Sequence, residues 1–152
     1  MKNRIYNKIA AFFLLPMLML VGCSAPLAVS MDEGASVLKT DRKDMGYVYI
    51  YRDAEFLASA RGIYIAANGK RVGALNSGTY FIYEAKPGNL VLAAENSLEK
   101  PVTRTMTISP GKKYFIQGSF KSGFWDVIPN LTIMNNNEGE AAIQSLKYSV
   151  LK

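Results

Sequence analysis

From residue 46 to residue 134 the chain alternates between hydrophobic and polar positions with a period of two, the spacing of side chains along a β-strand. Residues 47–52 show the pattern most clearly, with tyrosines on one face and Val48 and Ile50 on the other. Both faces of this strand are apolar or amphipathic, as in the centre of a sheet. The pattern predicts further strands at residues 63–67, 70–75, 79–84, 90–95, 102–108 and 113–117, and a last pair at 124–128 and 131–134 interrupted by Pro129-Asn130.

Tight turns separate most of these strands. Asn68-Gly69 accepts the positive φ angles of a two-residue type I′ hairpin, and Pro87-Gly88 and Pro110-Gly111 are typical of the other turns. Connections this short exclude parallel crossovers, which need about a dozen residues or more. We therefore expect a mainly β fold, an antiparallel β-sandwich of seven or eight short strands.

The carboxyl end changes to a helical period. Ala142, Ile143 and Leu146 share one helical face, which predicts a short C-terminal helix over residues 141–148. Such a helix would cover a sheet face or an edge.

The first residues have the parts of a secretory signal peptide. Lys2, Arg4 and Lys8 precede an uncharged run over residues 9–22, which is shorter than the ~20 residues of a spanning helix. The run ends in Leu20-Val21-Gly22-Cys23, which resembles the lipobox of bacterial lipoproteins.

The lipobox resemblance implies cleavage between Gly22 and Cys23 and acylation of Cys23, so that the membrane is bound through covalent lipid. The alternative is a signal anchor in which Cys23 is a free or buried thiol. Ser24, at the second position of the mature chain, resembles the sorting signal of outer-membrane lipoproteins. We therefore expect the protein on the periplasmic side of the outer membrane if the host is Gram-negative. We therefore expect three regions: a signal peptide at 1–22, a lipidated tether at 23–45, and a β-sandwich domain with its C-terminal helix at 46–152.

The composition excludes several kinds of active site and metal site. The 152 residues include no His and one Cys, which excludes Ser-His-Asp and Cys-His nucleophiles, a His-ligated zinc and an intramolecular disulfide. Loss of residues 1–22 would halve the net charge of +6. The rest of the sequence has no long basic run, so we expect no nucleic-acid partner. We expect no catalytic residues, no metal and no cofactor.

Five segments in order resemble a known family: YVYIYR, IYIAANGKRVGAL, SGTYFIYEAKPGNL, ISPGKKYFIQ and LTIMNNNEGEAAI. Together with the lipobox, this set resembles the bacterial lipoproteins of domain-of-unknown-function family 2846, over about residues 47–146. Its hairpins also resemble those of PEGA-like and carboxypeptidase-regulatory-like sandwiches. The resemblance implies a small β-sandwich tethered to a membrane and brings no known activity.

Two groups of aromatic residues are candidates for a binding surface. Tyr47, Tyr49 and Tyr51 form a stripe that could stack on sugars or peptides, and Phe124-Trp125 could form an exposed tip. The alternative for both is core packing, because aromatic residues are good strand formers. Lysines at turns, in Lys70-Arg71 and Lys112-Lys113, could contact lipid phosphates or anionic envelope polymers.

These observations predict a membrane-anchored envelope lipoprotein that acts as a non-catalytic binding or scaffolding module, with an envelope protein or a glycan as partner. One alternative is an accessory of enzymes that act on peptidoglycan or other glycans. Another is an immunity or inhibitor lipoprotein.

Overall fold

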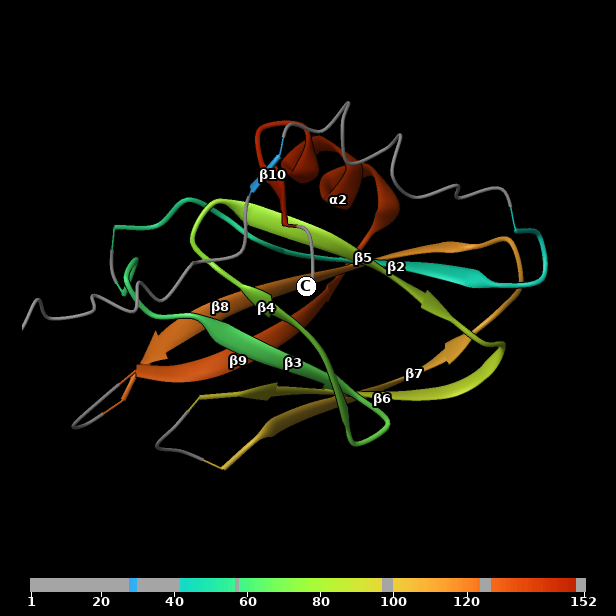
Figure 1. Ribbon diagram of the computed structural model, residues 1–152, viewed down its shortest axis with the longest axis horizontal. Helices are drawn as coiled ribbons and strands as arrows, with labels where there is room; N and C mark the ends of the chain where they lie inside the picture. The colour runs from blue at the N-terminus through green and yellow to red at the C-terminus, as the bar shows by residue number, and fades with distance from the viewer. Residues whose placement is uncertain (1–27, 30–41, 57, 97–99, 124–126, 150–152) are drawn as a thin grey trace, which may run out of the picture.

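The structure, a computed structural model, describes residues 28–29, 42–56, 58–96, 100–123 and 127–149. These residues form a sandwich of two stacked β-sheets, with a helix on the outer side of one sheet (Figure 1). The six-stranded sheet contains, in spatial order, β1 (Ala28–Val29), β10 (Lys147–Ser149), β5 (Thr79–Ala85), β2 (Gly46–Arg52), β8 (Lys113–Ser122) and β9 (Val127–Met134). The four-stranded sheet contains β4 (Lys70–Leu75), β3 (Ile63–Ala67), β6 (Gly88–Glu95) and β7 (Val102–Ile108). The expected sandwich is confirmed.

Two strand pairs are parallel, whereas tight turns predict an antiparallel arrangement throughout. The central strand β2 pairs in parallel with β8, and β10 pairs in parallel with β5. Turn length constrains only strands that are consecutive in the chain, so it says nothing of a pair such as Tyr47 and Lys113. The described residues hold ten strands, more than the seven or eight expected, because the short β1 and β10 add to the sheet. Strand β1 falls within the segment 23–45 that we expected to be a tether.

The hairpin of β3 and β4 matches the prediction closely. Asn68 and Gly69 have φ angles of 49° and 79°, as a type I′ turn requires. The strands on either side begin and end at the predicted residues.

Strand β9 corrects the prediction of a break at Pro129-Asn130. It runs without interruption from Val127 to Met134, with Pro129 opposite Phe120 of β8. Proline is tolerated there because β9 is the edge strand, so the missing N–H need not remove a ladder hydrogen bond.

The helix lies earlier than predicted. It spans Asn136–Ile143 (α2), and the Asn135 side chain caps it by accepting a hydrogen bond of 2.9 Å from the Glu138 amide. The predicted segment 141–148 therefore holds the end of the helix, a turn, and most of β10. Of the three consecutive asparagines, Asn135 is the N-cap and the other two begin the helix.

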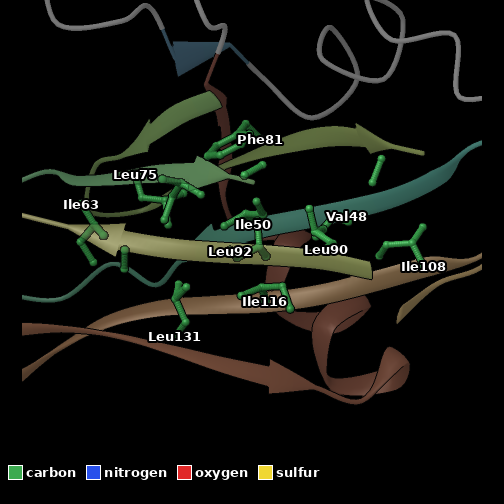
Figure 2. Packing of buried hydrophobic residues seen from close by; sticks show 14 residues of the cluster. Val48, Ile50, Ile63, Leu75, Phe81, Leu90, Leu92, Ile108, Ile116 and Leu131 are labelled. Atoms are coloured by element: carbon green, nitrogen blue, oxygen red, sulfur yellow. The ribbon is translucent and has the colours of Figure 1, made fainter. Parts of the chain in front are cut away.

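Two hydrophobic clusters stabilise the fold. The larger one fills the space between the two sheets and includes Val48, Ile50, Ile65, Leu92 and Ile116, as Figure 2 shows for several of its members. The smaller one lies on the other side of the six-stranded sheet and consists of tyrosines, Phe115 and residues of and beside α2. The side chains of β2 alternate between the two clusters, which explains why both of its faces are hydrophobic.

Candidate binding surface

The tyrosine stripe of β2 is buried, which corrects its reading as a binding surface. Tyr47, Tyr49 and Tyr51 are 5%, 9% and 1% exposed, and they pack in the same cluster as Ile143 and Leu146. The reason is the helix: α2 and the chain that follows it cover this face of the sheet, and Tyr148 of β10 closes one side. The tyrosines therefore serve as core residues.

Ring contacts fix the geometry of this cluster. The rings of Tyr49 and Phe115 stack with centroids 4.9 Å apart, and Tyr80 meets Tyr148 edge-on at 5.3 Å. The Tyr47 hydroxyl donates to the Arg42 carbonyl at 3.0 Å. Burial raises the pKa of Tyr49, and it raises the pKa of Tyr51 and Tyr148 as well, because a phenolate is poorly solvated there.

The other predicted site residues lie outside the described residues. These are Gly22 and Cys23 of the cleavage and acylation site, and Phe124 and Trp125 of the proposed aromatic tip.

The outer face of the four-stranded sheet is open to solvent within the described part of the chain. The inward positions of its strands belong to the core between the sheets, and α2 lies on the opposite side of the sandwich (Figure 1). The outward side chains, identified by register and burial, are those of Tyr64, Ala66, Arg71, Ala74, Asn89, Val91, Ala93, Glu95, Thr103, Thr105 and Thr107. We call this set the open face.

The open face has a polar side and a charged aromatic side. Thr103, Thr105 and Thr107 form a row of exposed hydroxyls along the edge strand β7. On the other side, the guanidinium of Arg71 lies 4.1 Å from the centre of the Tyr64 ring and 3.3 Å from a carboxylate oxygen of Glu95.

Small side chains occupy the centre of the open face. Ala66 is paired across strands with Ala93, and Val91 with Thr105. Tyr64 is 39% exposed and Val91 is 40% exposed, so a hydrophobic ring and an aliphatic side chain both meet solvent here. Ala66 is only 3% exposed, whereas the hydroxyls and the guanidinium at the borders of the face can supply hydrogen bonds to a partner.

A second exposed feature is formed by residues 53–56 and 58–62, which follow β2. The side chain of Arg52 is fully buried beside these residues. Its guanidinium donates hydrogen bonds to the carbonyls of Arg61 at 2.6 Å and Ala58 at 3.0 Å. The Ser77 hydroxyl also bonds both the amide and the carbonyl of Glu55. These bonds hold residues 55, 58 and 61 in place, and Phe56 is fully exposed.

The open face is not among the binding surfaces that the sequence predicts. One sign of it was present, because threonine occupies every second position from 103 to 107, a pattern expected of a strand face in contact with water. Nothing in the alternation of the strand at 63–67 distinguished the exposed Tyr64 from the buried tyrosines of β2.

The acidic residues of the described ranges are largely engaged in ion pairs. Carboxylates within 4.0 Å of Arg or Lys nitrogens belong to Asp44, Glu55, Glu84, Glu95 and Glu140. No group of three or more acidic residues in the described ranges has an arrangement that could hold a metal ion. None of the helices in those ranges is long and apolar enough to cross a membrane.

The fold and the open face define a class: a small β-sandwich in which a helix covers one sheet and nothing in the described ranges covers the outer face of the other. The chain belongs to the family described as "Protein of unknown function (DUF2846)", whose model matches residues 42–130. It is also similar to an uncharacterized protein of Haemophilus influenzae, with 27% identity over 135 residues that cover 88% of this chain and 79% of that protein. The expected family is thus confirmed, and its description names no activity.

Proposed function

We propose that the protein is a membrane-anchored envelope lipoprotein that binds a partner, without catalysis, through the open face. The observation that carries the proposal is the contrast between the two outer sheet faces. One is buried beneath α2, whereas the other has no cover among the described residues and exposes Tyr64 and Val91 beside a row of threonines.

The membrane anchor in this proposal comes from the sequence. The lipobox ending at Cys23 supports acylation, and two or more acyl chains would hold the domain stably at a bilayer. If the host is Gram-negative, Ser24 supports the outer membrane as the location of the protein. The partner is then an envelope protein or a glycan strand.

Site-specific photo-crosslinking in the native envelope tests the binding surface. A photoreactive amino acid replaces Thr105 at the centre of the open face, and the same replacement at Gln144, exposed at the end of α2, is the matched control. We expect a defined adduct from position 105 and none from position 144. A discrete mass increase identifies a protein partner, and a ladder that collapses on lysozyme treatment identifies a glycan. Equal or absent crosslinking at the two positions would contradict the proposal.

A Cys23→Ser variant tests the anchor in the same cells. It should lose metabolic labelling with palmitate and accumulate as the uncut precursor, because the thiol that is acylated before cleavage is absent. Appearance of the variant at the mature mass in the membrane fraction would refute the lipoprotein part of the proposal.

A further inference from the structure

The four-stranded sheet ends in β7, an edge strand with few of the features that prevent pairing with another chain. Its seven residues pair with β6 in unbroken register and include no proline. The other long edges of the described sheets differ from it. Strand β9 contains Pro129, and β4 begins with the exposed Lys70 and Arg71 and shifts in register beside Ile65. Because prolines, bulges and edge charges discourage pairing, β7 is the edge best suited to receive another strand.

The hydrogen bonds of β6 show which backbone groups of β7 are free. The Asn68 amide donates to the Val91 carbonyl at 2.8 Å, and the Val91 amide donates to the Asn68 side chain at 2.9 Å, so residue 91 faces the β3 side. Backbone groups alternate in direction along a strand, so Leu90 and every second residue after it face β7. Their partners in β7 are the even-numbered residues. The odd-numbered residues of β7 therefore direct their amides and carbonyls to the free edge. These are Thr103, Thr105 and Thr107, which we call the edge threonines.

The side chain of Arg104 agrees with this direction. Its guanidinium donates to the Thr103 carbonyl at 2.9 Å and to the Asn130 side chain of β9 at 3.4 Å. The one charge of β7 is thus held across the sandwich. A carbonyl oxygen has two lone pairs, so the Thr103 carbonyl can accept a second hydrogen bond from an incoming strand.

The sequence of β7 is complementary to itself when two copies run antiparallel about Thr105. Thr105 then lies opposite the same residue of the second copy, and Thr103 lies opposite Thr107. Since the backbone groups of all three point outward, each of these pairs exchanges two hydrogen bonds. On the open face threonine meets threonine, which is a favourable cross-strand pair. On the inner face Arg104 lies opposite Met106, so no like charges are directly opposed.

We propose that the protein pairs with a second copy of itself through β7, so that the two four-stranded sheets join edge to edge. This inference goes beyond the proposed function and does not depend on the membrane anchor. Residues directly opposite each other in antiparallel strands have their side chains on the same face, so the two open faces become continuous.

The size of the open face gives this pairing a use. Its four strands are five to eight residues long and cover roughly 400 Å² at a strand spacing of about 4.8 Å. That is about half of the ~800 Å² that each partner contributes to a standard protein interface. Two copies joined through β7 offer a partner a face of the usual size.

Cysteine crosslinking in the full chain tests the pairing. Thr105 or Thr132 is replaced by cysteine, and the cell fraction that contains the protein is treated with a mild oxidant. Opposed residues of a hydrogen-bonded antiparallel pair have Cα atoms about 5.5 Å apart, within the range of a disulfide. Thr132→Cys, exposed on the edge strand β9, is the matched control, and the parent chain controls for crosslinking through Cys23. We expect about fivefold or more disulfide-linked dimer from Thr105→Cys than from either control.

Two further variants test the register. In the proposed pair, residue 103 of one copy is four positions, or about 13 Å, from residue 103 of the other. Thr103→Cys alone and Thr107→Cys alone should therefore give little dimer, whereas the two variants expressed together should crosslink to each other. Thr105→Pro added to both chains should abolish this crosslink, because it removes an N–H from the free edge and none from the ladder with β6. Its circular dichroism should match that of the parent.

The outcomes separate this inference from the proposed function. Equal dimer yields from Thr105→Cys and Thr132→Cys would overturn the pairing, as would strong dimers from Thr103→Cys alone. Either result leaves the proposed function in place. In the photo-crosslinking experiment at position 105, an adduct of twice the mass of the chain supports the pairing, and an adduct of another mass identifies the partner of the open face.

Discussion

Arg52 is the charged residue that the fold buries most completely among the described residues. Its side chain is fully buried, its guanidinium donates to two loop carbonyls, and it lies 4.8 Å from the centre of the Phe120 ring. Burial lowers the pKa of Arg52, while Glu55 acts in the opposite direction. The Arg52 side chain thus gives the carbonyls of Ala58 and Arg61 the hydrogen bonds that water would otherwise provide.

Replacing Arg52 by leucine should destabilise the domain by about 2–4 kcal/mol, because two loop carbonyls lose a charged donor and leucine supplies none. Urea denaturation followed by circular dichroism measures the change. Lys121→Leu is the matched control, since it removes a cation from an exposed position of the same sheet and should change the free energy of unfolding by less than about 0.5 kcal/mol. Equal losses for the two variants would rule out this role of Arg52.

At the scale of elements, α2 approaches β8 closely because residue 139 has no side chain. A Cβ at Gly139 would overlap the ring of Phe115, so only glycine fits between the helix and the strand. A glycine, which is a poor helix former, is therefore the contact point of the helix with the sheet.

Gly139→Ala should lower stability by about 1–3 kcal/mol through steric overlap, although alanine has the higher helix propensity by about 1 kcal/mol. Thermal unfolding provides the measurement. Asn137→Ala on the exposed side of the same helix is the control and should be neutral or slightly stabilising. A gain in stability for Gly139→Ala would show that the helix can move away from Phe115 at no cost.

The tyrosine cluster under α2 predicts loss of stability in alkali. The pKa values of Tyr49, Tyr51 and Tyr148 are raised above the ordinary 10.0, so above this pH the unfolded chain loses phenolic protons that the folded chain still holds. Since the unfolded state then binds fewer protons, the free energy of unfolding falls as the pH rises, whereas it is unaffected by these groups below their ordinary pKa. Denaturation at a series of pH values across 10.0 should show this fall.

Tyr49→Phe is the control for the alkaline effect, because phenylalanine preserves the stacking on Phe115 and cannot ionise. Its stability should decline less steeply with pH than that of the parent protein. Identical pH dependence of the two proteins would exclude Tyr49 as a contributor.

At the scale of the whole molecule, local patterns account for much of the fold and little of the surface. The hairpin over residues 63–75 follows from Asn68-Gly69, whose geometry depends on near neighbours alone. The parallel pairing of β2 with β8 and the position of α2 depend on segments distant in sequence, and alternation along one strand cannot reveal them.

The candidate site likewise depends on contacts between distant segments that local patterns do not reveal. Tyr49 and Tyr64 both lie on strands with alternating patterns, yet one is buried beneath a helix and the other is exposed. Which of two amphipathic sheet faces receives the helix is decided by packing of the complete domain, in which the ring of Phe115 lies against Gly139.

The parallel pair of β2 and β8 also has a kinetic consequence. Its partners Tyr47 and Lys113 are more than 60 residues apart, so this central ladder is a contact of high sequence separation, and such contacts slow folding to milliseconds or longer. A nascent chain that ends before residue 113 cannot complete the middle of its larger sheet. We therefore expect the domain to stay unfolded until nearly all of it has been synthesised, a state compatible with threading through a translocation channel.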